Sequence, residues 1–425
     1  MAKIAIVNGV RTPFVKAWGV FDNLPAHRLG ALCVTELLQR TKLDSRLVDE
    51  VIMGCVAQPA EAANVARVIS LLAGIPKEKK AYTVCRNCAS GFEAVTSAAE
   101  KIQCGMDEIV IAGGTESMSH MPLLFNKEAS TLFQKLSKAK TILDRIKIFA
   151  QMRPRHFVPT PSLMLGLTDP VCGLNMGQTA ELLAKDFGIS REAQDRFALE
   201  SHRRAAAAAE KLREETTDVF VPPEYRACVR DDNGIRKNQT YEALEKLKPI
   251  FDRKTGTVTA GNASQVTDGA CALLLMTEEK AEKLGLEVLG YLRDYAYVGL
   301  EPARMGLGSA IAIEKVLEQN SLDLKDIDLF EINEAFAVQV LACLRALASG
   351  DFAKKCFSSG LPVGEIPREK LNVNGGAIAL GHPVGTSGAR LILTCLKEMK
   401  RRSLRRGLVT ACIGGGQGAA LILER

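Results

Sequence analysis

The sequence is poor in aromatic residues and in histidine. Aromatic side chains make up 5% of its 425 residues, with one tryptophan, and there are five histidines. No apolar run reaches the roughly 18 residues that a membrane-spanning helix needs. Residues 1–7 lead directly into a predicted strand and contain neither the apolar core nor the cleavage site of a signal peptide. We therefore expect a cytoplasmic protein without a membrane span.

The twelve cysteines do not form a disulfide framework. They are scattered over a long chain, which is typical of a reducing compartment. Cys85 and Cys88 form a Cys-x-x-Cys pair, but no second pair of ligands follows at zinc spacing, so we predict no metal site. The formal net charge of +6 is small for this length, and we expect no nucleic-acid partner.

The excess positive charge is concentrated in residues 127–155. Eight Lys or Arg residues are accompanied there by only Glu128 and Asp144, so this segment alone carries +6. The segment also has apolar residues at roughly helical spacing, namely Leu132, Leu136, Leu143, Ile146 and Phe149. We predict a basic amphipathic helix that contacts a membrane surface, phosphates or a partner protein. The alternative is a solvated face over an apolar stripe that packs within the chain.

Length and pattern together predict an α/β protein with more than one domain. Short apolar strands alternate with helical patterns over residues 1–119. Residues 120–265 interrupt this alternation with proline-rich pieces and an alanine-rich helix, and we interpret them as an inserted loop domain. The alternation resumes at about 266–290, which we expect to complete the first half. Residues 291–425 then form a second half.

The two predicted halves resemble each other. The pattern Leu-Asp, Val-Asp, Val-Ile of residues 43–52 recurs as Leu-Asp, Ile-Asp, Phe-Glu in residues 322–331, each time after a helix and before a strand. Ser90-Gly91 at the start of a helix likewise recurs as Ser387-Gly388. We infer that one α/β unit is duplicated, and that sites form where strand ends of both halves meet.

Residues 82–91 combine a short apolar strand with the start of a helix, whose apolar pattern continues to Ile102. Cys88 therefore lies at a helix N-terminus, where unpaired N–H groups and the helix dipole favour a negative charge. A thiol in such a place loses its proton more easily, and the thiolate is the reactive form. We predict that Cys88 is a nucleophile. The alternative for a lone cysteine is a buried structural side chain.

Three glycine-flanked loops in the second half supply candidate partners for Cys88. They are residues 331–337, 372–388 and 411–418. The second loop holds His382 between a glycine and a proline, and its many glycines let backbone N–H groups approach a ligand, as an oxyanion hole requires. The third loop holds Cys412. A cysteine nucleophile, a histidine that deprotonates it and a second cysteine as acid and base make a set for acyl transfer.

These loops resemble those of the thiolase family, and the likeness covers essentially the whole chain, including the inserted region. The loops of His382 and Cys412 match the family's signatures almost position by position. Residues 175–181 and 261–270 are also similar to thiolase segments. One departure is Cys85, because the family usually has Asn, Ser or Thr three residues before the nucleophile.

The resemblance implies a five-layered αβαβα fold with a βαβαβαββ order in each half. It also implies coenzyme A thioester chemistry, with CoA as a substrate and without a metal or a permanently bound cofactor. Cys88 would attack the 3-keto carbon of a 3-oxoacyl-CoA. His382 would take the thiol proton and contribute to an oxyanion hole, and Cys412 would protonate the departing acetyl-CoA enolate.

The same resemblance assigns supporting roles to five further residues. Asn333 would hold the water of one oxyanion site, and Gly414 would supply an N–H to the other, together with the N–H of Cys88. Ala263, Ser264 and Phe336 would contact coenzyme A.

The basic segment around residues 136–147 is similar to the β-subunit of fatty-acid β-oxidation trifunctional complexes, which acts beside a hydratase/dehydrogenase α-subunit. This favours fatty-acid degradation, with a homodimer or tetramer as the assembly. The alternatives are a biosynthetic enzyme that forms acetoacetyl-CoA and a non-catalytic lipid-binding or scaffold protein. A 3-oxoacyl carrier-protein synthase is a further alternative, but it pairs its cysteine with two histidines, whereas the second partner here is Cys412.

Overall fold

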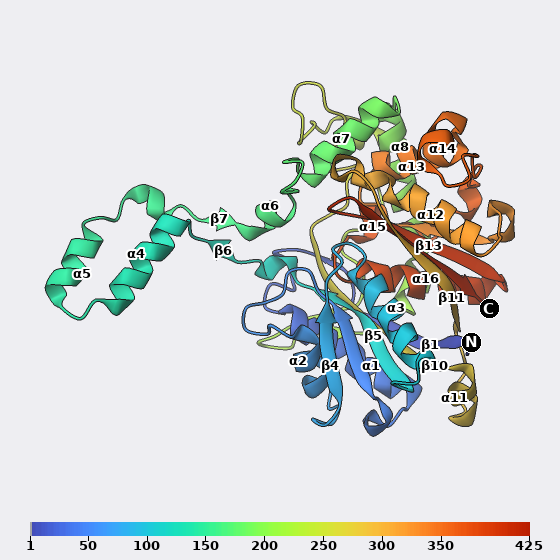
Figure 1. Ribbon diagram of the computed structural model, residues 1–425, viewed down its shortest axis with the longest axis horizontal. Helices are drawn as coiled ribbons and strands as arrows, with labels where there is room; N and C mark the ends of the chain where they lie inside the picture. The colour runs from blue at the N-terminus through green and yellow to red at the C-terminus, as the bar shows by residue number, and fades with distance from the viewer. Residues whose placement is uncertain (1) are drawn as a thin grey trace.

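The computed structural model describes residues 2–425, and its centre is one mixed sheet (Figure 1). The strands of this sheet are β1 (Ile4–Arg11), β2 (Val15–Lys16), β3 (Glu50–Gly54), β4 (Lys80–Val84), β5 (Ile109–Glu116), β10 (Thr267–Thr277), β11 (Gly290–Gly299), β12 (Leu329–Ile332), β13 (Arg406–Ile413) and β14 (Gln417–Glu424). They lie in the order β12-β13-β14-β11-β1-β10-β5-β3-β4, and β2 pairs with β10. Within residues 2–425 no helix has the length and apolar character needed to cross a membrane.

The sheet consists of two equivalent halves that meet where β1 and β11 pair antiparallel. In each half an antiparallel run of three strands (β1-β10-β5 and β11-β14-β13) is extended by a parallel strand, β3 or β12. Asp49 before β3 accepts hydrogen bonds from two backbone N–H groups at the start of β5. Asp328 before β12 does the same at the start of β13. The predicted duplication is therefore confirmed.

Helices cover the outer face of each half and fill the space between the halves. The helices of the two halves are α1 (Ala26–Thr41), α2 (Val65–Leu72), α3 (Ser90–Gln103), α11 (Glu278–Lys283), α12 (Gly308–Gln319), α13 (Ala337–Ala348), α14 (Gly350–Cys356), α15 (Ala377–Leu380) and α16 (Ser387–Arg402). Short 3-10 helices lie at Ser45–Leu47, Met118–His120, Pro154–Phe157, Pro302–Leu307, Leu324–Asp326 and Arg368–Lys370.

The apolar core falls into four clusters, and the three large ones fill the spaces between five layers. In β10, Ala272 and Leu274 pack toward α1 and α2, whereas Leu273 and Leu275 pack toward α3 and α16. Both faces of this strand are buried, which explains its continuous apolar sequence. A third cluster packs α12 and α13 on the outer face of the second half. The order helix–sheet–helix–sheet–helix confirms the predicted fold class.

Two glycines bring the central helices together at their N-terminal ends. A Cβ on Gly91 of α3 would lie 2.6 Å from the backbone nitrogen of Ala389, and a Cβ on Gly388 of α16 would lie 2.5 Å from that of Phe92. Only a residue without a Cβ permits this approach. The segments that precede the two helices therefore lie close to each other.

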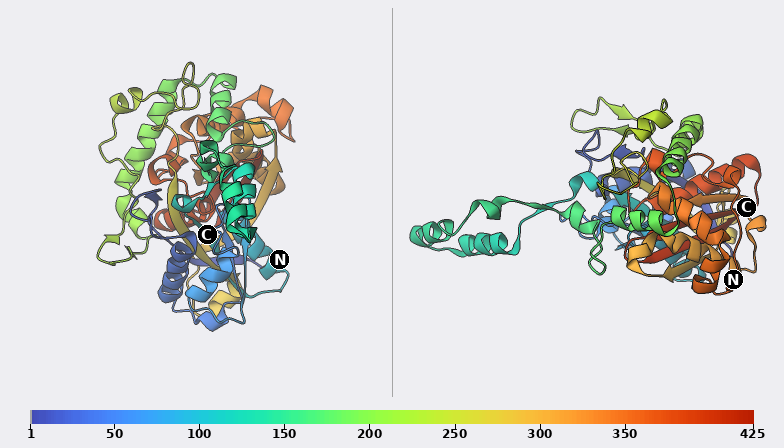
Figure 2. Two further views of the ribbon diagram at one scale, coloured as in Figure 1. Left: turned by 90° about the vertical axis from the view of Figure 1, so that its left-hand side faces the viewer. Right: turned by 90° about the horizontal axis from the view of Figure 1, so that it is seen from above.

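The segment between β5 and β10 adds short elements outside these layers. They are β6 (Leu123–Leu124), α4 (Lys127–Lys138), α5 (Ile142–Phe149), β7 (Thr160–Pro161), α6 (Ser162–Gly166), α7 (Met176–Asp186), α8 (Arg191–Ala207), α9 (Ala209–Arg213), β8 (Val219–Phe220), β9 (Cys228–Val229) and α10 (Tyr241–Glu245). Helices α7 and α8 lie against α13. The α4–α5 hairpin projects far from the body on β6 and β7 (Figures 1 and 2). The boundaries of this inserted domain at 120 and 265 stay predictions.

The single basic helix expected within residues 127–155 is wrong, because the segment forms two helices. The chain leaves the helical conformation at Ala139, and the Thr141 hydroxyl accepts the N–H of Asp144 at 3.1 Å to begin α5. Four apolar residues of α5 are largely exposed, with exposed fractions from 58% to 77% (Ile142, Leu143, Ile146 and Phe149), whereas Ile148 is half-buried.

Candidate active site

Cys88 lies in a tight turn between β4 and α3, as the sequence predicts. Asn87 has a φ of +44°, a left-handed conformation that asparagine tolerates better than most residues. The N–H of Ala89 donates to the carbonyl of Arg86 at 3.0 Å, and the N–H of Ser90 donates to that of Asn87 at 3.0 Å. The turn leaves Cys88 half-buried and directly before the N-terminal end of α3.

The Cys88 thiol lies beside two backbone N–H groups, those of Gly414 and of Cys88 itself. Burial raises the pKa of Cys88 above its ordinary value, and hydrogen bonds from the N–H groups of Gly414 and of Cys88 itself lower it by less. The expectation that Cys88 loses its proton easily is therefore wrong for this structure, because the loss of solvent outweighs the N–H groups. The same two N–H groups are those that the family resemblance assigned to one oxyanion site.

His382 precedes α16 in the loop that the sequence singled out. Gly381 has a φ of +108°, and a Cβ there would lie 2.4 Å from the Thr267 hydroxyl, so the position requires glycine. The His382 Nδ1 atom lies 2.6 Å from the Ser387 hydroxyl, which donates to the carbonyl of Pro383 at 3.1 Å. We infer from this network that Nδ1 carries the hydrogen and that Nε2 presents a lone pair.

The imidazole of His382 is neutral near pH 7. Burial, and then the charge of Arg390, lower the pKa of His382 to about 4. The Asn333 Nδ2 atom lies 3.4 Å from His382 Nε2. The Oδ1 atom of Asn333 is buried and has no hydrogen-bond partner within residues 2–425. The site thus holds a neutral imidazole whose Nε2 accepts from the Asn333 amide, beside an amide oxygen that is free to accept a hydrogen bond.

Cys412 lies near the end of β13 and is fully buried. Burial, and then the nearby Cys88, hold the pKa of Cys412 well above its ordinary value. Gly414 follows the strand and begins a run of three glycines, of which Gly415 and Gly416 have φ values of +91° and +78°. The structure therefore brings Cys88, Gly414 and Cys412 together from opposite halves of the chain.

The three residues predicted to contact coenzyme A also lie together. Ala263 and Phe336 form an antiparallel bridge, and the N–H of Ser264 donates to the carbonyl of Ala335 at 3.0 Å. The ring of Phe336 packs edge-on to that of Phe251, with centroids 6.0 Å apart. Phe336 directly precedes α13, three residues after Asn333, so this cluster adjoins the loop of the site.

Two buried glutamates support the site and were missed in the sequence. Glu116 at the end of β5 accepts the N–H groups of Ala57 at 2.8 Å and Gly385 at 2.7 Å, and thereby joins the first half to the His382 loop. Glu334 accepts the Ser201 hydroxyl at 2.6 Å and the Asn372 amide at 2.8 Å. Their position in the sequence was the available signal. Glu116 is the last residue of the buried strand β5, and Glu334 lies two residues after the buried strand β12.

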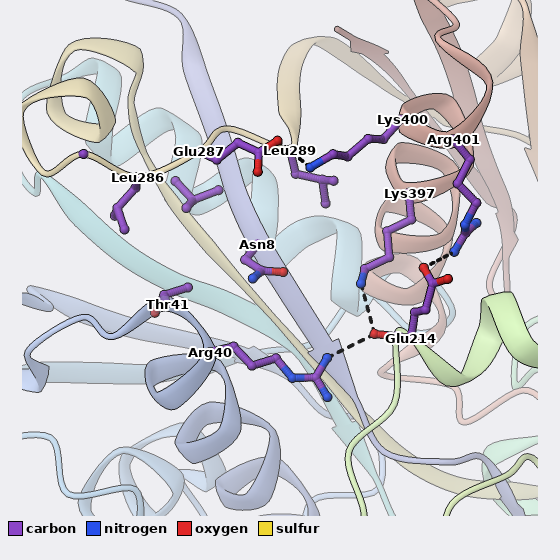
Figure 3. Close-up of a pocket in the computed structure, with 12 residues that line it drawn as sticks. Asn8, Arg40, Thr41, Glu214, Leu286, Glu287, Leu289, Lys397, Lys400 and Arg401 are labelled. Atoms are coloured by element: carbon purple, nitrogen blue, oxygen red, sulfur yellow. Dashed lines mark hydrogen bonds and ion pairs between the residues drawn. The ribbon is translucent and has the colours of Figure 1, made fainter.

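A pocket of about 660 Å³ contains none of the predicted site residues (Figure 3). It lies beside the C-terminal turns of α16, and Lys397 and Arg40 both donate there to the carbonyl of Glu214 at 3.0 Å. Its other charges are paired, Arg401 with Glu214 and Lys400 with Glu287. Across residues 2–425 no three His, Cys, Asp or Glu side chains are grouped to hold a metal ion.

Known proteins resemble this chain over its whole length. Residues 4–279 match the family described as "Thiolase, N-terminal domain", and residues 286–425 match "Thiolase, C-terminal domain". The chain is 44% identical to a 3-ketoacyl-CoA thiolase of Pseudoalteromonas translucida (strain TAC 125) and 43% identical to one of Serratia proteamaculans (strain 568). Both alignments cover 99% of this chain and 97% of the relative.

Solved structures also resemble this chain, both in sequence and in fold. The Bacillus anthracis acetyl-CoA acetyltransferase is 36% identical with a TM-score of 0.87, and covers 100% of this chain and 99% of its own. The human mitochondrial 3-ketoacyl-CoA thiolase in complex with CoA is also 36% identical, with a TM-score of 0.85 and coverage of 100% and 98%. On sequence and on fold alike, this chain belongs to the thiolase family.

Proposed function

We propose that the protein is a 3-ketoacyl-CoA thiolase (acetyl-CoA C-acyltransferase) of fatty-acid β-oxidation that works in the cytoplasm. It would cleave a 3-oxoacyl-CoA with CoA into acetyl-CoA and an acyl-CoA shortened by two carbons. The observation that carries the proposal is the meeting of the Cys88 thiol with the N–H of Gly414, beside a buried Cys412. The names of the full-length bacterial relatives support the same activity.

In the first half of the proposed reaction, Cys88 sulfur attacks the 3-keto carbon while His382 Nε2 takes the thiol proton. The bond between C2 and C3 then breaks, the acyl group stays on Cys88, and the acetyl-CoA enolate takes a proton from Cys412. The raised pKa of Cys412 suits this step, because the thiol stays protonated until a strong base forms beside it.

In the second half, CoA enters as the second substrate. The Cys412 thiolate takes the proton of the CoA thiol, and the CoA sulfur attacks the thioester on Cys88. Cys88 leaves as a thiolate and recovers its proton from His382. Both cysteines and the histidine return to their starting state, so the cycle needs no other reactant.

Two oxyanion sites would stabilise the negative oxygens. Cys88 and Gly414 would donate two backbone N–H groups to one, and protonated His382 with a water on Asn333 would serve the other. The buried Oδ1 of Asn333, which lacks a partner in residues 2–425, supports a bound water there. Ala263, Ser264 and Phe336 would contact CoA.

Thiolysis rates on a series of 3-oxoacyl-CoA substrates from C4 to C16 test the proposal. Release of acetyl-CoA across the series is the expected result, and rates that are highest for long chains support β-oxidation. A second candidate is acetoacetyl-CoA synthesis, which the similarity to the Bacillus anthracis acetyl-CoA acetyltransferase favours. Activity restricted to C4 would replace the first proposal with the second, and no activity would favour a non-catalytic member of the family.

We further propose that the enzyme assembles as a homodimer or tetramer. We also propose that its α4–α5 hairpin contacts an anionic membrane. The exposed apolar residues of α5 lie beside lysines, and each basic residue near anionic lipid contributes about 1 kcal/mol. Replacing Lys135, Lys138, Lys140 and Lys147 with Gln should weaken binding to vesicles that contain phosphatidylserine. A loss of co-purification with a hydratase/dehydrogenase α-subunit, or a higher KM for both C4 and C16 substrates, would instead assign the hairpin to that subunit or to CoA.

A further inference from the structure

The two residues before Cys88 reach across the boundary between the halves. The Nδ2 atom of Asn87 donates to the carbonyl oxygen of Gly414 at 2.8 Å. The Nη1 atom of Arg86 donates to the side-chain oxygen of Gln417 at 3.3 Å. The turn that carries the thiol is thereby joined to the loop between β13 and β14, which lies more than 300 residues away in the sequence.

This glycine loop needs an external restraint. Gly414, Gly415 and Gly416 form the connection between two buried strands, and glycine has more conformational freedom than any other residue. Gly416 is confined by packing, because a Cβ there would lie 2.2 Å from the carbonyl oxygen of Leu300. Gly414 is buried but has no backbone against it: a Cβ there would lie 3.3 Å from the Met176 sulfur and 3.9 Å from the Asn87 amide nitrogen. The hydrogen bond from Asn87 fixes the carbonyl of the peptide between Gly414 and Gly415, and through the backbone of Gly414 it restrains the neighbouring peptide that carries the Gly414 N–H.

Asn87 is suited to this task by its backbone as well as by its side chain. Its left-handed φ of +44° is one that asparagine adopts with little strain. It is also bonded to Cys88 directly, so any movement of Asn87 moves the N–H of Cys88. One residue thus controls both N–H groups of the same proposed oxyanion site.

We propose that Asn87 is a positioning residue whose amide holds Gly414 so that the N–H groups of Gly414 and Cys88 converge on one oxyanion. This inference rests on the proposed thiolase function and names the side chain that sets the geometry of its site. The hydrogen bond of the Asn87 amide goes to the Gly414 carbonyl. It acts through Gly414.

The variants Asn87→Gly and Asn87→Asp test the inference. Glycine keeps the left-handed backbone without strain but removes the amide, and aspartate keeps the size but cannot donate to the carbonyl of Gly414. Removing an oxyanion-hole donor costs about 10²–10³-fold in kcat. A donor that is only misdirected should cost less, and we expect kcat to fall by about 10-fold or more in both variants, with KM for CoA changed less than about twofold.

A second measurement does not depend on thiolysis. When the N–H of Gly414 turns away, the Cys88 thiolate is less stabilised, so alkylation of Cys88 by iodoacetamide should slow and its pH profile should move to higher pH. A merely structural loss would lower the melting temperature without moving that profile. This readout also works if the wild-type protein has no thiolysis activity.

Asn64→Gly is the matched control, because Asn64 is an exposed asparagine whose amide likewise donates to a distant carbonyl, that of Ala81 at 3.1 Å. It should leave kcat and the alkylation profile unchanged. The inference is overturned if Asn87→Gly stays within about twofold of wild type in both measurements, if Asn87→Asp behaves as wild type, or if Asn64→Gly causes the same losses.

Discussion

The two halves of the chain carry different side chains at the same position. In the first half the strand β4 passes into the central helix α3 through residues 85–89, which carry Cys88. In the second half, Leu371 bridges to Phe330 of β12, in the position that β4 occupies beside β3. Residues 372–386 then lead from Leu371 to α16 and carry His382. Each connection ends beside the other because Gly91 and Gly388 let the two helices touch.

The difference between the connections shows how a duplicated unit acquires an active site. The short turn can present only a thiol and its own N–H, whereas the longer loop has room for a helix, α15, and a buried histidine. The histidine is then held by Ser387 from the start of its own helix. Neither half holds both groups, so the proposed chemistry requires the two halves to be joined.

The largest expected effect comes from removing the thiol of the shorter connection. Cys88→Ser should lower thiolysis on the order of 10⁴-fold or more, because no covalent intermediate can form at a useful rate. Mass spectrometry after brief exposure to acyl-CoA should find the acyl group on the Cys88 peptide of the wild-type protein. Cys85→Ser is the matched control and should keep both the adduct and the activity. An acyl adduct on Cys85 would show that Cys85, and not Cys88, is the nucleophile.

A smaller effect is expected for the second thiol, which the other half supplies. Cys412→Ser should still be acylated at Cys88 by acetyl-CoA, since His382 takes the Cys88 proton and a CoA thiolate can leave without a proton from Cys412. Exchange of the acetyl α-protons with solvent should slow by about 10²-fold, the scale of general acid–base catalysis. Exchange at the wild-type rate would show that Cys412 does not act at the carbanion.

The pH dependence separates the two connections further. Burial raises the pKa of Cys88 above its usual value near 9, so its thiolate fraction in the free enzyme should still rise about tenfold per pH unit between pH 7 and 9. The pKa of His382 is lowered to about 4, so the histidine stays neutral and adds no step in this range. Alkylation of Cys88 by iodoacetamide, corrected with the Cys88→Ser variant, should show one rising limb. A plateau below pH 8 would contradict the buried thiol.

The sequence predicts which residues form the site better than it predicts the contacts between those residues. Cys88 could be placed between a strand and a helix from local periodicity, and the repeated aspartates revealed the duplication. The contact of Asn87 with Gly414 could not be predicted, because it joins segments that only the folded sheet brings together. The predicted direction of the Cys88 pKa shift was wrong for the same reason, because the burial that raises this pKa depends on tertiary packing. The break of the hairpin into α4 and α5 did have a local signal, Thr141 three residues before Asp144.

The smallest effect on activity concerns the contact that holds the halves together. Gly91→Ala or Gly388→Ala would place a Cβ within 2.6 Å of the facing backbone, and the two helices would have to separate. Such overpacking costs about 1–3 kcal/mol, so each variant should unfold at lower temperature, and its thiolysis rate should fall by less than that of the two cysteine variants. Gly350→Ala is the matched control, because nothing lies within 4 Å of the Cβ position there. If Gly91→Ala is as stable as this control, the helices do not depend on the glycine contact, and another feature must bring Cys88 and His382 together.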